Sequence, residues 1–543
     1  MSFLRRGLRV LCMQTLSLTI AAPNLAELLR RCRQAALVSI LSAPLIIPPA
    51  AGTGSVGLSS VGSTTIPNFA FTDNPVETSD RFGFSFATGD FNGDGVDDLA
   101  TGVPYDKLGV AGPTPHGSVF VQLGSAGGGL SAASPSLDLT DFFGGHFGWA
   151  LAAGDFDGDQ IDDLAVGSPE GEVGLGHIYG FVRVYYGSAT PEVFGAAVNV
   201  SNVGVLQAAR TGFALAAGNF NGDGFDDLAI ATPGLNTNAG AVRIAYGGAS
   251  GLADPGSVID QDTPGAEGVR EAQDLFGYSL AAGDFDGNGD DDLAVGVVNE
   301  DQVGLVQVFF STASGLDPAA DLLLSQNTVA GTGELNDQFG FALAAADFDG
   351  DGKDDLAIGS PGEALGVANE ITNTGIVVIV YGSTSVSFDL ARTQAWGQGG
   401  ILGVDTAEIG DRFSAALAAG DFDADGFADL AIGQPEEDVT GTNDGALTVQ
   451  MGGANGFSQA RARFLAAGTN GLPGPIQSHS NYGFGAATGD FDADGFADLV
   501  IGAPYHDQDG TILDSGLEVI LYGGLYCDGF EDAATGFWST VAP

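Results

Sequence analysis

Short runs of alternating large and small side chains recur along the chain, separated by glycine, proline and aspartate. From Phe82 the first is "FGFSFATGDF", and "DDLATGVP" follows it across an acidic loop. "GSVFVQLGS" comes after a connection rich in glycine and proline, and "GLSAASPSLDL" after a glycine turn. Each run is typical of a short strand bounded by turn residues, and no helical periodicity lies between them. The pattern predicts units of four antiparallel strands.

The acidic loop between the first two strands of the unit is repeated seven times. Its twelve-residue segment, "GDFNGDGVDDLA" in the first copy, starts at Gly89, Gly154, Gly218, Gly283, Ala346, Gly420 and Gly489, at intervals of 65, 64, 65, 63, 74 and 69 residues. A fixed period in a chain of 543 residues favours one repeat array over a string of unrelated domains. We therefore predict an all-β fold, a seven-bladed β-propeller of four-stranded antiparallel blades.

Each loop has the composition of a cation site. Counted from its first acidic or amide residue, positions 1, 3, 5 and 9 are always Asp or Asn, and position 6 is Gly in every copy except for Gln160. Alternate side chains converge on one point, the glycine allows a sharp bend, and the position 7 carbonyl adds an oxygen, a set that suits Ca²⁺. Metal-free Asx turns are the alternative.

The prediction is up to seven Ca²⁺ ions. Position 12, where an EF-hand has a bidentate Glu, holds Thr101 or a β-branched apolar residue, so each loop continues into a strand instead. The predicted ligands are Asp90, Asn92, Asp94, Val96 and Asp98; Asp155, Asp157, Asp159, Ile161 and Asp163; Asn219, Asn221, Asp223, Phe225 and Asp227; Asp284, Asp286, Asn288, Asp290 and Asp292; Asp347, Asp349, Asp351, Lys353 and Asp355; Asp421, Asp423, Asp425, Phe427 and Asp429; and Asp490, Asp492, Asp494, Phe496 and Asp498.

Two further elements frame the loops: a Phe-Gly pair before them, as in Phe82-Gly83, and a Gly-x-Pro after them, as in Gly102-Val103-Pro104. With seven copies over residues 76–524, the chain resembles the FG-GAP repeat family, the propeller of integrin α subunits and of many bacterial secreted proteins. Units three, four and six depart from the pattern in one or both elements. The resemblance implies calcium binding and extracellular recognition, and it names no ligand.

The ends of the chain predict closure and export. The last unit contains only three strands, and residues 64–73, "TTIPNFAFTD", are placed to supply the fourth; a disordered leader is the alternative. Residues 1–51 combine a basic stretch with a short apolar run and small residues, as in a secretory signal, with a membrane anchor as the alternative. The boundaries are then 1–51, a closing segment 52–75, the propeller 76–524, and a tail 525–543 that is a sorting tag or a disordered end.

The net charge of the chain limits the classes of partner that it can bind. The formal charge is 17 minus 69, or −52, which excludes nucleic acid and anionic lipid surfaces because both need a basic face. Seven bound Ca²⁺ ions would offset 14 of these negative charges. The three cysteines, two of them in the export segment, provide no disulfide framework. We expect a monomer without a membrane span in the mature chain, secreted or on the surface of a bacterial cell.

No catalytic arrangement is found in the sequence. None of the five histidines lies in an HExxH motif, no serine lies in GxSxG, and the spaced aspartates are explained by metal ligation, so we predict that the chain is not an enzyme. The loops share one face of the disc, and the variable second-to-third strand connections share the other. We predict a binding or adhesion module for a protein or glycan on that variable face. A calcium-stiffened structural protein and a lectin-like propeller are the alternatives.

Overall fold

The computed structural model describes residues 63–67, 79–107, 115–130, 136–140, 145–171, 180–189, 194–195, 197–200, 209–253, 256–364, 372–384, 387–398, 407–439, 442–458, 461–466, 477–507 and 513–523. All of them belong to the unit formed by Ser59–Pro543. The predicted signal segment, 1–51, and the predicted tail, 525–543, lie outside the described residues.

Seven antiparallel sheets of four strands each confirm the predicted all-β propeller. Blade 1 contains β2 (Ser85–Gly89), β3 (Asp98–Val103), β4 (Ser118–Gln122) and β5 (Ser136–Thr140); blade 2 contains β6 (Leu151–Gly154), β7 (Asp163–Ser168), β8 (Phe181–Tyr185) and β9 (Val198–Val200); blade 3 contains β10 (Leu215–Gly218), β11 (Asp227–Ala231), β12 (Val242–Ala245) and β13 (Ser257–Ile259); blade 4 contains β14 (Phe276–Gly283), β15 (Asp292–Val297), β16 (Leu305–Thr312) and β17 (Gly315–Ser325). Blade 5 contains β18 (Leu343–Ala346), β19 (Asp355–Ser360), β20 (Ile376–Gly382) and β21 (Phe388–Gly397); blade 6 contains β22 (Ala416–Gly420), β23 (Asp429–Gln434), β24 (Ala446–Gln450) and β25 (Ala462–Ala466); and blade 7 contains β26 (Gly485–Gly489), β27 (Asp498–Ala503), β28 (Leu517–Leu521) and β1 (Ser63–Pro67).

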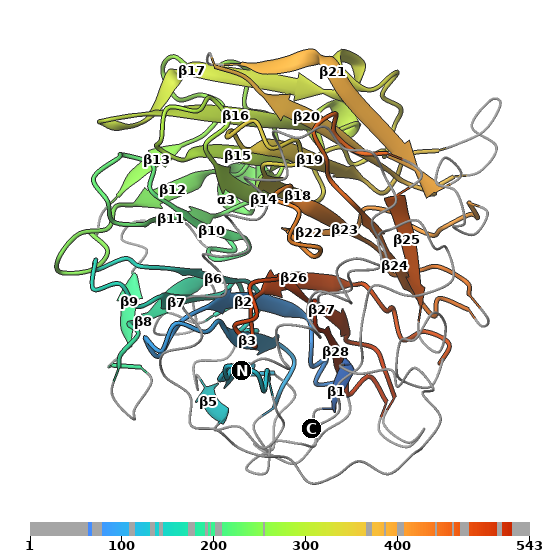
Figure 1. The fold of residues 1–543 in the computed structure, drawn as a ribbon. Helices are drawn as coiled ribbons and strands as arrows, with labels where there is room; N and C mark the ends of the chain where they lie inside the picture. Colours follow the sequence, from blue (N-terminus) through green and yellow to red (C-terminus); the bar gives the residue numbers. More distant parts are fainter. Residues whose placement is uncertain are drawn as a thin grey trace, which may run out of the picture. The chain divides into compact units, whose positions relative to one another are not determined.

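The first strand of each blade lies nearest the axis. These strands contact one another in the closed order β2, β6, β10, β14, β18, β22, β26 and back to β2, and Figure 1 shows them around the centre with the fourth strands at the periphery. Among the described residues, helix occurs only in connections: α3 (Leu235–Asn238), a 3₁₀ turn at Glu300–Gln302, and α4 (Gln326–Val329).

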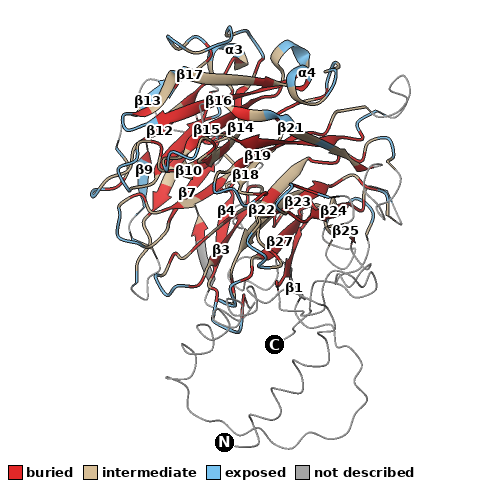
Figure 2. Ribbon diagram, turned by 45° about the horizontal axis from the view of Figure 1, so that its top comes forward, coloured by how far each residue is buried: buried red, intermediate tan, exposed pale blue. Residues whose placement is uncertain are grey.

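The core is divided among the seven joints between neighbouring blades. Each apolar cluster combines residues of two adjacent blades; one holds Phe91 of blade 1 with Leu164 of blade 2, and the next holds Phe156 with Leu228 of blade 3. The phenylalanine at position 2 of every acidic loop is buried. Figure 2 shows the burial extending along the second and third strands. Each loop is therefore held in place by its buried phenylalanine, which packs in the apolar cluster between two blades.

The N-terminal strand closes the ring, as the sequence predicted. Strand β1 pairs antiparallel with β28, with Thr65 opposite Val519 and Pro67 opposite Leu517. The described strand covers Ser63–Pro67, and residues 68–73 of the predicted segment lie outside the described residues. Pro67, which cannot donate to a ladder, is the last residue of this outermost strand.

A carboxylate that the sequence analysis did not assign connects neighbouring blades. In five blades the Asp at position 8 of the loop accepts a hydrogen bond from the backbone N–H at position 1 of the preceding blade, an arrangement that we name the interblade clamp. The bonds are Asp90 N to Asp162 Oδ2 (2.9 Å), Asp155 N to Asp226 Oδ2 (3.0 Å), Asn219 N to Asp291 Oδ2 (2.9 Å), Asp284 N to Asp354 Oδ2 (3.1 Å) and Asp490 N to Asp97 Oδ2 (2.8 Å).

The clamp is absent at two joints of the described ring, where blades 6 and 7 have Ala428 and Ala497 at position 8. Only the backbone bond remains there, from Ala428 N to the carbonyl of Asp347 (2.9 Å) in the first case. The residue before position 1 is small where a clamp aspartate lies against it. A Cβ at Gly154 would lie 2.8 Å from Asp226 Oδ2. Ala346 packs with Ala428, which has no carboxylate, so there is room for its methyl group.

We expect Asp162→Ala to lower the free energy of unfolding by about 1.5–3 kcal/mol, because it leaves the N–H of Asp90 without its charged acceptor. Asp162→Asn is the matched control, since it keeps an acceptor oxygen at the same place, and it should retain most of the stability. Denaturant unfolding in excess chelator measures the effect without a contribution from metal affinity. Equal stability of the alanine variant and the unsubstituted chain would contradict the clamp.

Candidate functional site

Each acidic loop is the turn between the first and second strands of its blade, so all seven lie on one face of the propeller. The position 1 carboxylate holds the turn by accepting backbone N–H groups from positions 5 and 6: in the first loop, Asp94 N to Asp90 Oδ1 (3.0 Å) and Gly95 N to Asp90 Oδ2 (2.7 Å). These bonds bring the alternate side chains to the same side of the loop. They also belong to an Asx turn, so they do not distinguish the two interpretations of the loop.

Position 6 is left-handed in all seven loops. The six glycines have φ between 84° and 94°, and Gln160 is held at a φ of 70°. This is the sharp bend that the sequence predicted, and glycine reaches it without a Cβ penalty. The second loop therefore carries backbone strain at position 6, and the sixth and seventh loops carry it at position 4, where Ala424 and Ala493 have φ of 50° and 56°.

The position 9 aspartate is the most buried ligand candidate. Asp98 has no exposed surface, and its carboxylate accepts hydrogen bonds from Phe91 N (3.1 Å) and from Gly124 N (2.9 Å), a residue beyond the third strand. The same pair of contacts recurs in the other blades, as at Asp498 with Phe491 N (2.9 Å) and Gly523 N (2.7 Å). Position 9 thus fixes the loop to the body of its blade.

Burial disfavours the ionised form of the position 9 carboxylate when no cation is bound. Desolvation raises the pKa of Asp98, Asp227 and Asp292 to about 7. It raises the pKa of Asp163, Asp355 and Asp429 to about 8, and that of Asp498 to about 9. A bound cation would favour the ionised form of each of these groups.

The structure brings predicted ligands together in several loops. Carboxylate oxygens lie within 4.8 Å of one another in the groups Asp155, Asp157 and Asp163; Asp284, Asp286 and Asp292; Asp347, Asp349 and Asp351; and Asp421, Asp423 and Asp425. In the first loop, Asn92 instead donates from Nδ2 to Asp98 Oδ2 (3.0 Å). Three oxygens this close fit a hard cation, which completes its shell with carbonyls and water. The position 7 carbonyls as ligands stay a prediction.

Two loops contain basic partners that the sequence analysis missed. In the fifth, Arg392 Nη1 lies 2.6 Å from Asp349 Oδ2, and Lys353 Nζ lies 2.6 Å from Asp351 Oδ1. In the sixth, Arg461 Nη2 lies 3.0 Å from both Asp423 Oδ2 and Asp425 Oδ2. The two arginines come from or adjoin the fourth strands, some 40 residues after their loops, so loop spacing alone gave no sign of them. A cation entering these loops must displace the ion pairs.

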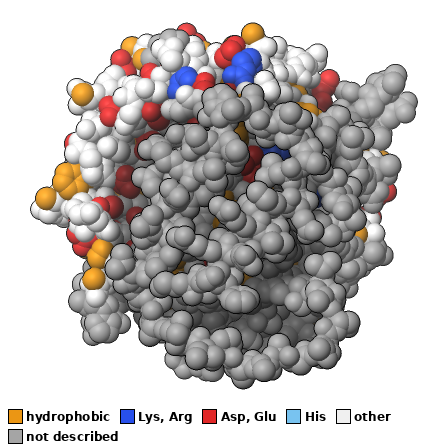
Figure 3. All heavy atoms as spheres, viewed as in Figure 1, with side chains coloured by type: hydrophobic (Ala, Val, Ile, Leu, Met, Phe, Trp, Pro, Cys, Tyr) orange, Lys and Arg blue, Asp and Glu red, His pale blue; other side chains and the backbone are white. Residues whose placement is uncertain are grey.

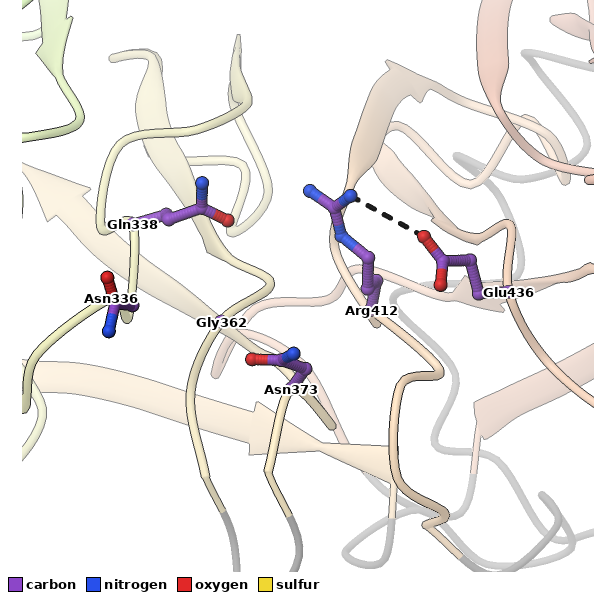
Figure 4. Close-up of a pocket in the computed structure, with 6 residues that line it drawn as sticks. All are labelled: Asn336, Gln338, Gly362, Asn373, Arg412 and Glu436. Atoms are coloured by element: carbon purple, nitrogen blue, oxygen red, sulfur yellow. Dashed lines mark ion pairs between the residues drawn. The ribbon is translucent and has the colours of Figure 1, made fainter.

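The opposite face carries a polar pocket of about 310 Å³ between blades 5 and 6. It is lined by Asn336, Gln338, Gly362, Asn373, Arg412 and Glu436, and Figure 4 shows the Arg412 guanidinium directed at the Glu436 carboxylate, 3.5 Å away. The guanidinium also lies over the ring of Phe341, 5.1 Å from its centroid. The pocket combines amide, cationic and anionic groups, all from connections rather than strands.

Half-buried aromatic side chains form a belt at or just before the starts of the inner strands. Each of them comes immediately after the glycine of the Phe-Gly position. Consecutive ring centroids are 4.9–5.6 Å apart in the order Phe484, Phe84, Trp149, Phe213, Tyr278 and Phe341. Blade 6 interrupts the belt with Ala415. Arg412 of that blade reaches Phe341 at the interruption.

Charge on the described surface is predominantly acidic. In Figure 3 red acidic side chains recur along the described margin of the molecule, and blue basic ones gather at few places. No helix in the described part of the chain is both long and apolar enough to span a bilayer.

The described structure is a seven-bladed propeller with one acidic loop in each blade. The family model described as FG-GAP repeat matches the chain seven times, at residues 82–121, 147–181, 211–244, 276–309, 339–380, 413–449 and 482–513. The chain belongs to the FG-GAP repeat family, as the resemblance in its sequence indicated.

Similar proteins include integrin α subunits. Integrin alpha-PS2 of Drosophila melanogaster is 32% identical over 270 residues, which is 46% of this chain and 18% of that protein. Integrin alpha-V of Gallus gallus is 33% identical over 227 residues, 40% of this chain and 20% of that protein. A phosphatidylinositol-glycan-specific phospholipase D of Rattus norvegicus is 35% identical over 162 residues, 28% of this chain and 19% of that protein. The matched part of the chain thus spans about a fifth of the length of these relatives.

Proposed function

We propose that the chain is an extracellular calcium-binding β-propeller that acts as a binding or adhesion module. The observation that carries the proposal is the convergence of carboxylates in the repeated loops, with oxygens within 4.8 Å in four of them. Like charges this close are unfavourable unless a cation or protons neutralise them. The membership of the FG-GAP family and the likeness to integrin α subunits support the same role.

The ligands of each loop are positions 1, 3, 5 and 9, with the position 7 carbonyl as a fifth. Affinities near the ~10⁻⁴–10⁻³ M of extracellular modules are appropriate to such open loops. The third loop should be the weakest, because Asn219 and Asn221 leave it only two ligand carboxylates. The arginines beside the fifth and sixth loops lower affinity there as well, since their ion pairs must first be broken.

The partner, a protein or a glycan, binds the face opposite the loops, where the polar pocket and the variable connections lie. One observation weighs against a lectin. Tyr105 and Tyr505, aromatic residues of second-to-third strand connections, enclose Arg81, whose guanidinium lies 4.0 and 4.6 Å from the two ring centroids. Those ring faces are occupied by a cation and are closed to sugar stacking.

Recognition rather than catalysis is the activity proposed for this monomeric, secreted or cell-surface protein of bacterial type. The predicted export segment, 1–51, and the tail, 525–543, are part of that proposal and fall outside the described residues.

A protein and glycan array probed with and without calcium tests the proposal. The labelled full chain should bind at least one class of ligand, and Arg412→Ala should weaken that binding because it removes the cation of the pocket. Arg183→Ala, on the third strand of blade 2, is the control. Normal calcium binding with no ligand in either class would instead favour the calcium-stiffened structural protein.

A further inference from the structure

A second type of acidic cluster lies outside the loops, at the joint between blades 4 and 5. Glu334 and Asp337 belong to the connection between these blades, and Glu363 follows β19 of blade 5. One carboxylate oxygen from each lies within 4.8 Å of the other two. Asp337 is 1% exposed, and the two glutamates are partly buried. This connection and the end of β19 are on the face away from the seven loops.

The hydrogen bonds to this cluster leave most of its charge uncompensated. Glu334 N donates to Asp337 Oδ2 (2.5 Å), and Gln326 Nε2 donates to Glu363 Oε2 (2.5 Å). Both donors are neutral, and the ion pairs found among the described residues include none to these three carboxylates. Three buried or half-buried carboxylates therefore share one site without a positive side chain.

A buried amide oxygen at the same cluster has no partner. Gln326 is 1% exposed, and its Oε1 makes no hydrogen bond within the described part of the structure. The two ends of a side-chain amide exchange places when the group turns by 180°. Turned in this way, Oε1 replaces Nε2 beside Glu363 and becomes a neutral oxygen facing the cluster.

The same four residue types recur at the two neighbouring joints. Before blade 4 they are Gln261, Glu271, Asp274 and Glu300; before blade 6 they are Gln398, Glu408, Asp411 and Glu437. Gln261 Nε2 lies 2.9 Å from Glu300 Oε2, and Gln398 Nε2 lies 2.5 Å from Glu437 Oε2. Both glutamines are at most 2% exposed, and in each the Oε1 again has no hydrogen-bond partner among the described residues.

We infer that the joint between blades 4 and 5 binds a divalent cation, Ca²⁺, through the carboxylates of Glu334, Asp337 and Glu363 and the amide oxygen of Gln326. Hard cations of this size take six to eight oxygens, so water completes the shell. The joints before blades 4 and 6 supply the same ligand set. Such ions connect the end of the outer strand of one blade to the second-to-third strand connection of the next blade. This role is separate from that of the loops.

The competing way to neutralise the cluster is a proton shared between Asp337 and Glu363. Burial raises the pKa of Glu363 to about 8, which would keep a proton there at neutral pH. A shared proton leaves Glu334 charged, however, and it requires no third carboxylate. The two accounts differ in the number of ions that the protein binds.

Ion counting on the full chain tests the inference. Equilibrium dialysis against ⁴⁵Ca²⁺ should find one ion fewer in Glu363→Gln than in the unsubstituted chain, and the same number in Glu267→Gln, an exposed glutamate outside the cluster. An unchanged count in Glu363→Gln overturns the inference and favours the shared proton.

Should Glu363→Gln fail to fold, crystals of the unsubstituted protein grown in calcium provide the second measurement. An anomalous difference peak about 2.3–2.6 Å from oxygens of Glu334, Asp337 and Glu363 supports the site. Peaks in the loops without one at this joint overturn the inference and leave the proposed function intact. Absence of peaks from both places overturns both.

Discussion

Removal of calcium is expected to lower the melting temperature of the protein by about 10 °C. An ion that binds only the folded state stabilises it by RT ln(1 + [L]/Kd), or ~1.4 kcal/mol per site at ten times Kd, and seven loops sum to ~10 kcal/mol. With an unfolding entropy of ~2.1 cal/mol/K per residue over the 461 residues of Ser63–Gly523, each kcal/mol shifts the melting temperature by about 1 °C.

The measurement is a calorimetric scan in millimolar calcium and in excess chelator. Calcium added back beyond the chelator is the control and should restore the higher temperature. Magnesium should restore less, because it demands a small octahedral site and gives up its water reluctantly. Identical melting curves with and without chelator would mean that the loops are metal-free Asx turns.

Loss of the closing strand has the second large effect. A chain that begins at Asp80 lacks β1, so the five residues of β28, all buried in the closed ring, become an open sheet edge. Loss of about four ladder hydrogen bonds at ~0.5–1.5 kcal/mol each predicts a destabilisation of about 2–6 kcal/mol. An unpaired apolar edge is also a template for association with another chain.

Chains that begin at Gly54 and at Asp80 are compared by calorimetry and by light scattering. The longer chain is the control, because it keeps Ser63–Pro67 while lacking the apolar export segment. The shorter chain should melt several degrees lower and form aggregates. Equal melting temperatures and equal solubility would contradict closure by the N-terminal strand.

The propeller could be predicted because its information is local and repeated. A strand of alternating pattern, an acidic loop and a second strand recur seven times, so blade number and the shared face of the loops follow from counting. Closure was also predictable, since the seventh blade had three strands and an unassigned segment preceded the first.

The contacts that the sequence did not predict join residues that are far apart in the chain. Asp162 and Asp163 are adjacent and chemically identical, yet Asp162 bonds to the preceding blade and Asp163 to its own loop. Arg461 meets Asp423 only because β25 returns beside the sixth loop. The joint clusters bring together two connections and the end of an outer strand. The residues of one loop do not indicate which distant residues will contact it.

The most direct test of the central claim, that the acidic loops are calcium sites, is the number of calcium ions bound per chain at several millimolar free calcium. Equilibrium dialysis of the full protein should find more than three ions, because the three blade joints can account for at most that many. With most of the seven loops filled, the count lies between four and ten. A total of three or fewer would contradict calcium binding by most of the repeated loops.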